Sequence, residues 1–488
     1  MPVTFRRFLA SQTVSVFWFA LLSCAPVYRE GLPPGSPFLE SSDDTISRFP
    51  HGIAVGDVTG TSAMLWLRTD RPLKVRIEYE PIGVRSVSGS GTASQAMRVV
   101  EGVTEESQDG ILKLEFRDLA PATRYQVRVS AEGPTVGSAI SAKAEFKTLP
   151  LSQMQAPVAF GWSGDLGGQT RCRTDEASYG IFSLMQRQSW DFFLFLGDTI
   201  YGDEICGPPN ASGSDFKAVT LEQYRAKQRY QRGSLPLRRF LSTVPVYVTW
   251  DDHDVRNNFA GPYDDQMPAG RQALLDYWPI REQPEDPYRL YRSVRAGADL
   301  ELFILDTRQY RSRNAQPDGP SKTMLGTAQL AWLLGGLRAS TATWKVIASS
   351  VPLAVPKAGT DLEPGFDSWA RGLDGTGFET ELKQIAGTIV DQSIRNVVWL
   401  TGDVHFVQGL AFDVDRDGVP DFHEFTAGPL SAGTGRVTPV QSSFAVTTFI
   451  SEGGYQNFGA VRVDGRTFKV TVIDESGRVR FTHQLQAR

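Results

Sequence analysis

Five stretches of apolar residues each end at an aspartate. They cover residues 159–165, 192–198, 246–252, 302–306 and 397–403. A segment that is apolar at consecutive positions is typical of a β-strand covered on both faces, and parallel sheets of such strands bind ligands at their carboxyl ends. We therefore expect several carboxylates to converge at one edge of a sheet. Because like charges repel, a cation must hold them there, and a metal centre is the simplest one.

Upstream of these strands the pattern is different. Short segments alternate apolar and polar residues, most clearly at residues 61–68, 74–80 and 124–130. Alternation with a period of two predicts strands with one buried face. Residues 119–127 resemble the turn and tyrosine that lead into a strand of a fibronectin type III-like module. We predict a small all-β sandwich, an accessory domain, over residues 48–150.

In the second part of the chain, apolar strands alternate with segments of helical periodicity. The predicted helices cover residues 175–188, 327–337 and 379–390, and Thr327 is a plausible cap for the second. Strands that alternate with helices predict an α/β domain built in layers. We place this catalytic domain at residues 156–488.

The N-terminus has the features of an export signal. Arg6 and Arg7 precede an apolar stretch from Val14 to Leu22, which is followed by Ser23 and Cys24. This order predicts a signal peptide over residues 1–24, and the Leu-Leu-Ser-Cys sequence resembles a bacterial lipobox in which Cys24 becomes lipidated. An ordinary signal peptide with an incidental cysteine is the alternative.

Residues 25–47 are rich in Pro, Gly, Ser and acidic residues and predict a tether. We therefore expect an exported protein of the bacterial cell envelope, either periplasmic or an outer-membrane lipoprotein. Its contact with the membrane would be through the lipid anchor alone.

The net charge and the cysteines of the chain further limit the classes of function that fit the sequence. The 488 residues carry a net charge of −5 without a basic run, so the sequence predicts no nucleic-acid-binding surface. We expect a monomer. Apart from Cys24, the chain has Cys172 and Cys206, each in a loop after an apolar strand. In an oxidising compartment they could form a disulfide, although two unrelated thiols fit the sequence as well.

Three motifs place candidate ligands at the strand ends. In Gly-Asp198-Thr-Ile-Tyr201, a carboxylate and a phenol could reach one ion, and a phenolate prefers a trivalent metal such as iron. Residues 250–258 pack acids, a histidine and two amides directly after a strand. Asp403 and His405 are two positions apart, so both could point to one side of an extended segment. Together the three motifs favour a metal site over solvated turns.

In this order, the motifs resemble the alkaline phosphatase D family of the calcineurin-like metallophosphoesterases. Residues 305–311 (Leu-Asp-Thr-Arg-Gln-Tyr-Arg), 49–57 and 424–432 add to the resemblance, which spans essentially the whole mature chain. It implies a four-layer αββα catalytic domain behind the leading β-sandwich. It also implies hydrolysis of phosphate monoesters or diesters by a water that two metals activate. The implied metals are Fe3+ and a divalent ion, Ca2+ with Zn2+ or Mn2+ as alternatives.

The resemblance also assigns roles to individual residues. The trivalent ion would be held by Asp165, Asp198, Tyr201 and His405, with Asp198 bridging. The divalent ion would be held by Asp252 and Asp403, with Asn258 as a further ligand. His253 would be an acid or a substrate clamp near the leaving oxygen. Three residues would stand behind the ligands or face the phosphate, namely Asp251, Asp254 and Arg308. For Asp306 and Arg308, an internal salt bridge is the alternative.

Two positions depart from the family pattern. Asp165, followed by Leu-Gly-Gly, stands where many family members have a cysteine ligand, and this segment is more similar to the first motif of purple acid phosphatases. A carboxylate in place of a thiolate makes the site harder and leaves the choice of metals open. Asp254 stands where the family usually has glutamate, and its shorter side chain is expected to loosen a contact behind the ligands.

A second acidic segment follows the last metal motif. Residues 413–424 place acids at positions one, three, five, nine and twelve and a glycine at position six, which fits an EF-hand calcium loop. The five acids are Asp413, Asp415, Asp417, Asp421 and Glu424. Because the flanking residues predict strands, this would be an isolated structural Ca2+ loop on a hairpin. The alternative is an acidic turn in which Glu424 belongs to the next strand.

A function of another class also fits this sequence. The chain could be a surface-anchored binding protein that uses an inactive phosphoesterase scaffold and adheres through its sandwich. The nearly complete set of Asp, Tyr, His and Asn ligands favours the enzyme.

Overall fold

A computed structural model describes residues 48–83, 97–132, 139–361 and 363–488 of the protein. The signal segment, Cys24 and the tether therefore lie outside the described residues. Among the described helices, none combines the length and the apolar character needed to cross a bilayer.

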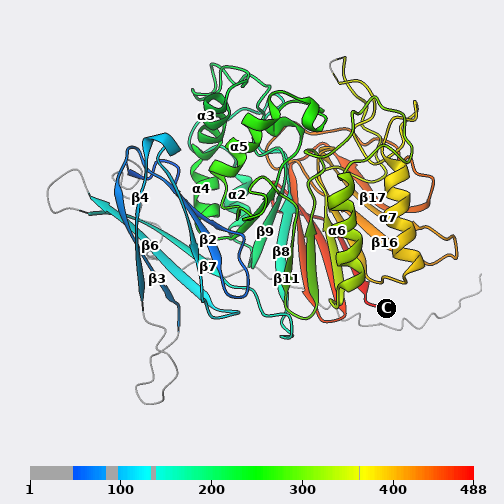
Figure 1. Ribbon diagram of the computed structural model, residues 1–488, viewed down its shortest axis with the longest axis horizontal. Coiled ribbons are helices and arrows are strands. Elements are labelled where there is room, and N and C mark those ends of the chain that lie inside the picture. Colours follow the sequence, from blue (N-terminus) through cyan, green and yellow to red (C-terminus); the bar gives the residue numbers. More distant parts are fainter. Residues whose placement is uncertain (1–47, 84–96, 133–138, 362) are drawn as a thin grey trace, which may run out of the picture.

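Two large sheets form the centre of the molecule (Figure 1). The first has the strand order β20-β19-β18-β8-β9-β10-β1-β2-β5. Its parallel middle strands are the first three apolar stretches of the sequence, and they are β8 (Val158–Ser163), β9 (Phe192–Leu196) and β10 (Val246–Thr249). On one side of them the chain adds β18 (Asn457–Asp464), β19 (Thr467–Asp474) and β20 (Val479–Gln486).

The second sheet has the order β11-β12-β13-β14-β16-β15-β17. Its parallel strands β12 (Leu300–Ile304) and β14 (Val397–Thr401) are the last two apolar stretches, with β13 (Trp344–Ala348) between them. The other strands are β11 (Arg292–Ala296), β15 (Phe406–Asp413), β16 (Phe422–Thr426) and β17 (Ala445–Gly453). The five predicted strands are therefore divided between two sheets.

The two sheets pack face to face and helices cover their outer faces, which gives the predicted four layers. Phe160 and Leu194 of the first sheet meet Leu302 and Val346 of the second in one buried cluster. The outer face of the first sheet packs against α2 (Ile181–Met185), α4 (Leu235–Leu241) and α5 (Met267–Tyr277), and α3 (Leu221–Arg232) lies against α5. The outer face of the second sheet packs against α6 (Gly326–Ala339) and α7 (Glu379–Asp391).

The N-terminal β-sandwich shares a sheet with the catalytic layers. One of its faces is a separate sheet in the order β4-β3-β6-β7, formed by β3 (Lys74–Pro81), β4 (Arg98–Val103), β6 (Arg124–Glu132) and β7 (Ala139–Lys147). Its other face is the far end of the nine-stranded sheet, formed by β1 (Ile53–Gly56), β2 (Ala63–Arg68) and β5 (Ile111–Phe116). Strands from both sides of residue 150 are thus hydrogen-bonded neighbours.

The contact between the N-terminal β-sandwich and the catalytic layers is tightly packed. β1 runs parallel to β10 with Gly56 opposite Val246. A Cβ atom at Gly56 would lie 2.5 Å from the carbonyl oxygen of Val246, so only glycine fits this approach. Nearby, the guanidinium of Arg232 is buried between the rings of Trp66 and Trp278, at 4.0 and 4.7 Å from their centroids.

Two of the three predicted helices match the structure closely. Residues 327–337 lie within α6 and residues 379–390 within α7, but Thr327 is not a cap. The backbone amides of Met324 and Leu325, just before α6, instead donate hydrogen bonds to the carboxylate of Glu381 in α7. The helix predicted at 175–188 is confirmed only over Ile181–Met185. In the first half of the predicted segment the Ser178 hydroxyl accepts hydrogen bonds from backbone amides of a turn, and helix α2 begins only at Ile181.

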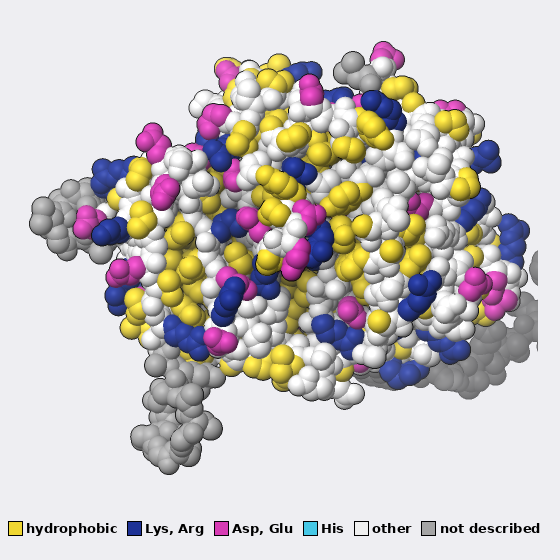
Figure 2. Space-filling view, viewed as in Figure 1, with side chains coloured by type: hydrophobic (Ala, Val, Ile, Leu, Met, Phe, Trp, Pro, Cys, Tyr) yellow, Lys and Arg dark blue, Asp and Glu magenta, His cyan; other side chains and the backbone are white. Residues whose placement is uncertain are grey.

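The described residues also include short turns of 3-10 helix. They are η1 (Glu106–Gln108), η2 (Asp252–Asp254) and η3 (Gly261–Tyr263). Over the face shown in Figure 2, basic and acidic side chains are intermixed.

Candidate metal centre

The predicted ligands come from both large sheets. Asp165, Asp198 and Asp252 follow β8, β9 and β10, whereas Asp403 and His405 follow β14. All of them are buried. Their oxygen and nitrogen atoms fall into three overlapping groups, each compact enough to hold an ion. The carboxyl ends of the two facing sheets thus meet at one site.

The backbone turns sharply at each of these strand ends. Five predicted ligands have a left-handed backbone, with φ values of +64° at Asp165, +49° at Asp198, +57° at Asn258, +72° at Asp403 and +57° at His405. Asp, Asn and His adopt this conformation more readily than other residues with a side chain, and strained positions of this kind cluster at functional sites. The turns direct the side chains into the space between the sheets.

Asp165, Tyr201 and His405 form one side of the site. The Nε2 atom of His405 lies 3.2 Å from the Asp165 carboxylate and 3.2 Å from the Tyr201 hydroxyl. The other ring nitrogen of His405 contacts the Gly433 carbonyl oxygen, which fixes the ring and leaves Nε2 directed at this group. Gly168 makes room for the tyrosine, because a Cβ there would lie 2.1 Å from the Tyr201 ring.

Asp198 belongs to two of the groups. Its carboxylate lies with Asp165 and His405 in one group and with Asp252 and His253 in another. Burial, and then the negative charges of Asp252 and its neighbours, raise the pKa of Asp198 well above its ordinary value. This position suits a carboxylate shared between two cations, because bound cations would reverse that effect.

Asp252, Asp403 and Asn258 form the other side. The backbone amide of Asn258 donates to Asp252, and the Asn258 Oδ1 atom is buried without a hydrogen-bond partner. One carboxylate oxygen of Asp403, one of Asp251 and one of Asp165 are likewise buried without a partner. Buried polar atoms rarely stay unpaired in proteins. Oxygen atoms in this arrangement fit a hard metal ion, so the residues present fit a metal centre.

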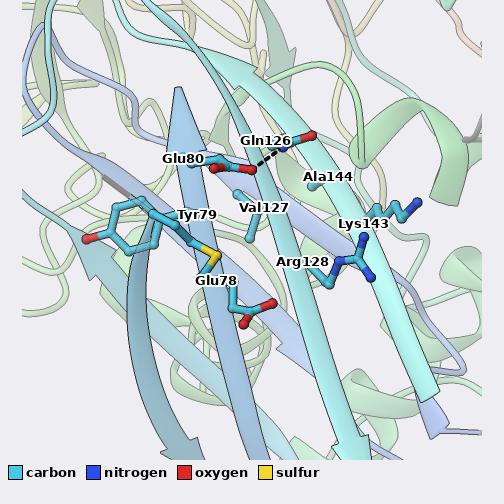
Figure 3. A pocket seen from close by; sticks show the side chains of 9 residues that line it. Glu78, Tyr79, Glu80, Gln126, Val127, Arg128, Lys143 and Ala144 are labelled. Carbon is cyan, nitrogen blue, oxygen red and sulfur yellow. Dashed lines mark hydrogen bonds between the residues drawn. The ribbon is translucent and has the colours of Figure 1, made fainter. Parts of the chain in front are cut away.

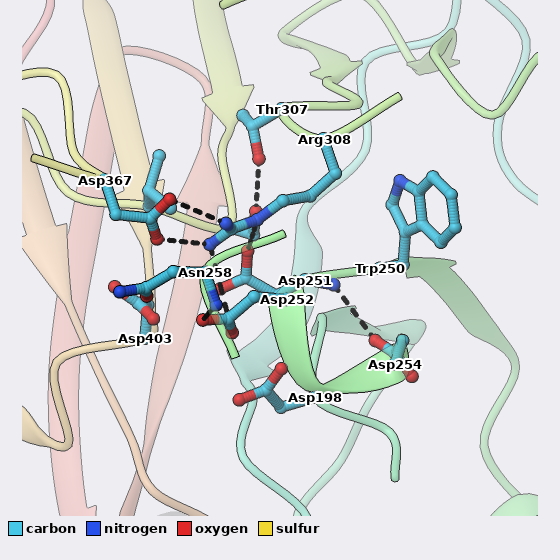
Figure 4. Close-up of polar contacts among 12 residues, drawn as sticks. Asp198, Trp250, Asp251, Asp252, Asp254, Asn258, Thr307, Arg308, Asp367 and Asp403 are labelled. Atoms are coloured by element: carbon cyan, nitrogen blue, oxygen red, sulfur yellow. Dashed lines mark hydrogen bonds and ion pairs between the residues drawn. The ribbon is translucent and has the colours of Figure 1, made fainter. Parts of the chain in front are cut away.

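Arg308 lies behind the carboxylates that form the site. Its side chain is 0% exposed and donates to Asp251 and, through two nitrogens, to Asp367 (Figure 4). Of the two roles predicted for Arg308, this position fits the one behind the ligands. Arg308 does form internal salt bridges, as the alternative proposed, but its partners are Asp251 and Asp367. Asp306 accepts instead from the Trp250 indole and from the backbone amide of Arg308.

Asp254 holds the strand ends together despite its short side chain. It accepts hydrogen bonds from the amide and hydroxyl of Thr199 at 3.1 and 2.5 Å and from the Asp251 amide at 2.9 Å. All these contacts are made, so the expected loosening does not occur. Burial raises the pKa of Asp251 to about 8, against the opposing effect of Arg308.

His253 is held by a carboxylate that the sequence did not reveal. Its Nδ1 atom lies 2.7 Å from Asp203, which also accepts from the Asn257 amide, and its ring lies 4.4 Å from that of Tyr201. Burial alone would lower the pKa of His253, but the charges of Asp252 and Asp203 outweigh it and raise the pKa to about 9. These two negative charges favour the protonated form of the ring.

Two further residues of the site come from the long loop before α7. Asp367 is fully buried and binds Arg308, Arg311 and Asn314. Lys357 reaches the carboxylates of Asp252 and Asp403. Neither residue follows an apolar strand, which is why the strand-end pattern missed both.

The two remaining cysteines are joined. Cys172 and Cys206 form a disulfide with a Cα–Cα distance of 5.6 Å, so of the two interpretations left open by the sequence the structure has the disulfide. It connects the loop after β8 with the loop after β9, which carry Asp165 and Tyr201 respectively. The bond therefore restrains both segments on the side of the site formed by Asp165, Tyr201 and His405.

A separate hollow lies on the four-stranded sheet of the sandwich. It has a volume of about 260 Å³ and is lined by side chains of β3, β6 and β7 and by Met97 (Figure 3). Glu80 and Gln126 are hydrogen-bonded across it. None of its lining residues belongs to the carboxylate site.

Comparisons with known proteins agree with this geometry. The chain matches the family model described as PhoD-like phosphatase over residues 168–473, and the model of its N-terminal domain over residues 36–150. Alkaline phosphatase D of Bacillus subtilis (strain 168) is 27% identical over 431 residues, which cover 79% of this chain and 70% of that protein.

Two solved structures share the fold. The structure of PhoD aligns with a TM-score of 0.71 at 22% identity and covers 91% of this chain and 93% of its own. Purple acid phosphatase PPD1 from yellow lupin (Lupinus luteus) seeds aligns with a TM-score of 0.62 at 12% identity, with coverages of 90% and 75%. At these identities the two alignments support the architecture of the layers.

The second acidic segment forms the turn between β15 and β16. Asp413, Asp415 and Asp421 have carboxylate oxygens close enough to share an ion, and Asp417 accepts a hydrogen bond from the Val419 amide. Glu424 does not join them, so the predicted twelve-residue calcium loop is wrong at its last position. As the alternative proposed, Glu424 belongs to the next strand.

Glu424 is a buried carboxylic acid between the sheet and the loop after β13. It is 0% exposed, and one of its oxygens accepts from the Leu353 amide at 2.8 Å and the Thr401 hydroxyl at 3.0 Å. The other oxygen has no partner. Burial raises the pKa of Glu424 from 4.5 to about 7. The folded protein therefore binds this proton more tightly than the unfolded chain does.

This difference predicts a pH-dependent effect of Glu424→Gln. Between pH 4.5 and about 7 the wild type loses stability as pH rises, because only the unfolded chain readily ionises the carboxyl. Glutamine does not ionise, so we expect the variant to gain up to roughly 3 kcal/mol relative to wild type across this window. Urea unfolding at pH 5 and pH 8 measures the gain. Thr401→Val removes a donor that favours the ionised carboxyl, so it should cost more stability at pH 8 than at pH 5. Parallel profiles for wild type and Glu424→Gln would contradict the assignment.

Proposed function

The chain belongs to the PhoD-like phosphatase family and is a phosphoric ester hydrolase, and from this premise we propose that it works with a trivalent and a divalent metal ion held side by side. The main support for this proposal is that five ligands from the strand ends converge at one site. Buried oxygens of Asp165, Asp403 and Asn258 there have no hydrogen-bond partner. Buried carboxylates this close together need a comparable positive charge.

The donor atoms favour different ions on the two sides. Asp165, Tyr201 and His405 combine a carboxylate, a phenol and an imidazole, which suits Fe3+. Burial and the neighbouring carboxylates raise the pKa of Tyr201 well above its ordinary value, so only a strongly polarising ion would bind it as a phenolate. Asp252, Asp403 and Asn258 offer oxygen alone, which suits Ca2+ or Mn2+. Asp198 lies between the sides and would bridge them.

The bound metals would lower the pKa of a water molecule and neutralise the charge on the phosphoryl oxygens. The protein's own part in the reaction is positioning and proton transfer. His253 carries a proton, is oriented by Asp203 and lies beside Asp198 and Asp252, so it is placed to donate that proton to the leaving oxygen. The ion pairs of Arg308 keep Asp251 and Asp367 fixed behind the ligands.

We also propose that the enzyme works at the bacterial cell envelope, anchored through a lipid on Cys24. The Leu-Leu-Ser-Cys sequence supports the anchor, and the Cys172–Cys206 disulfide suits an oxidising compartment. Palmitate labelling of cells that express the full chain should mark the wild type and not Cys24→Ser. Equal labelling of the two would contradict the anchor.

The metal requirement gives the first test of function. We expect purified protein to contain a transition metal and to hydrolyse p-nitrophenyl phosphate or bis-p-nitrophenyl phosphate. Prolonged treatment with a chelator should reduce turnover at least about a hundredfold, and metal should restore it. Asp198→Asn should lose both metals and activity. Full metal content without turnover on either ester would favour the binding-protein alternative over the enzyme.

The role of His253 predicts a dependence on the leaving group. His253→Ala should slow a phosphodiester with an alkyl leaving group by roughly 10²–10⁴-fold, because an alkoxide needs a proton to depart. A p-nitrophenyl ester should slow far less, since p-nitrophenolate leaves unaided. Asp203→Asn keeps the ring but weakens its orientation, and it should give a smaller loss with the same preference. Equal losses on both esters would exclude proton donation by His253.

A further inference from the structure

Lys357 contributes an ammonium group to the divalent side of the site. Its Nζ atom lies 3.2 Å from Asp252 and 3.7 Å from Asp367, and it contacts Asp403 more closely still. The three carboxylates are 0–1% exposed, whereas the lysine side chain is 23% exposed. The ammonium therefore enters the buried cluster from the side that faces solvent.

The other cationic side chains near this cluster have partners of their own. The ring of His253 lies near Asp252 but pairs directly with Asp203 at 2.7 Å. Arg308 donates to Asp251 and Asp367, and Arg311 donates to Asp367 and to the Thr307 carbonyl oxygen. Asp252 and Asp403 thus depend on Lys357 for their direct ion pairs, apart from Arg308 at 3.9 Å from Asp252. One ammonium supplies one positive charge to two carboxylates. A divalent ion would supply two, so it matches the pair better.

Hydrogen bonds fix the backbone of Lys357, whereas ion pairs with carboxylates hold its side chain. The Lys357 amide donates to the Ser368 hydroxyl at 3.3 Å, and its carbonyl oxygen accepts from the Asp367 amide at 2.8 Å. The four-carbon side chain can swing toward solvent without moving these anchors. Exchange of the ammonium for a metal ion therefore requires rotation of one side chain.

We infer that Lys357 is a built-in competitor of the divalent ion, occupying the Asp252–Asp403 pair when the ion is absent and leaving when it binds. This inference rests on the proposed function, which makes Asp252 and Asp403 ligands of the divalent ion. The lysine neutralises part of the carboxylate repulsion in the metal-free protein, so the site stays folded before metal arrives. The same contacts lower the affinity for the ion, because binding must displace them.

Calorimetric titration of chelator-treated protein with Mn2+ tests the competition. Lys357→Met removes the ammonium and keeps the side-chain volume, so we expect it to bind Mn2+ on the order of ten- to a hundredfold more tightly than wild type. The metal-free variant should unfold at a lower temperature than metal-free wild type, and added Mn2+ should raise its melting temperature by more. Lys357→Arg keeps the charge and should bind Mn2+ about as wild type does.

Two controls complete the design. Lys147→Met removes another partly buried lysine, which pairs with Asp191 at 2.7 Å outside the site, and it should leave Mn2+ affinity unchanged. If Lys357→Met does not fold, Lys357→Gln removes the charge and keeps a hydrogen-bonding group. Unchanged or weaker Mn2+ binding in the folded neutral variant would overturn the inference. This includes the outcome in which only the KM for phosphate ester rises, which would make Lys357 a substrate clamp.

Failure of the proposed divalent site would give a different result from failure of the inference about Lys357. If wild type binds no Mn2+, or if Asp403→Asn binds it as well as wild type does, the proposed divalent site itself is wrong. If wild type binds Mn2+ and Asp403→Asn does not, the site stands and only the comparison with Lys357→Met decides the role of the lysine.

Discussion

Repulsion among buried carboxylates is the constraint on which this structure depends. Asp198, Asp251, Asp252 and Asp403 are all nearly inaccessible to solvent and lie around one small space. Burial and mutual repulsion would each drive such groups to take up protons. Arg308, itself 0% exposed, offsets part of this cost by binding Asp251 and Asp367 from behind. One carboxylate oxygen each of Asp165, Asp251 and Asp403 is left without a hydrogen-bond partner, so the site can still accept further positive charge.

The strand-end ligands could be predicted because two physical signals coincide in them. An apolar strand indicates burial, and an acid directly after it indicates a buried charge at a sheet edge, as at Asp198 and Asp403. The residues that hold these ligands carry no such signal. Asp203, Lys357 and Asp367 lie in loops, and their partners are distant in sequence, so only the folded chain brings them together. The sequence left the orientation of the Glu424 side chain open for the same reason. Its spacing fits a calcium loop, but in the structure it lies in strand β16 and its side chain points into the interior.

The helices show the same limit at shorter range. Residues 379–390 have the right periodicity and pack on the second sheet as α7. At residues 175–188 the periodicity is similar, but the Ser178 hydroxyl bonds the local backbone and a turn replaces the first half of the helix. The start of α6 depends on Glu381, which lies in another helix. Hydrogen bonds between side chains and backbone groups determine where these helices begin. The periodicity of the sequence carries no information about such bonds.

The shared nine-stranded sheet has a consequence for the order of folding. β1 is the first strand of the described chain, yet its parallel neighbour β10 is made only after the whole sandwich and two strands of the catalytic layers. A chain that emerges from its N-terminus can form the hairpin of β1 and β2 early, but the edge of β1 stays open until residues 246–249 arrive. Pairings between distant segments form slowly, and open strand edges invite association with other chains. During synthesis the chain must therefore carry an incomplete sheet until residues 246–249 arrive, which makes the pairing of β1 with β10 at Gly56 the step most exposed to misassembly.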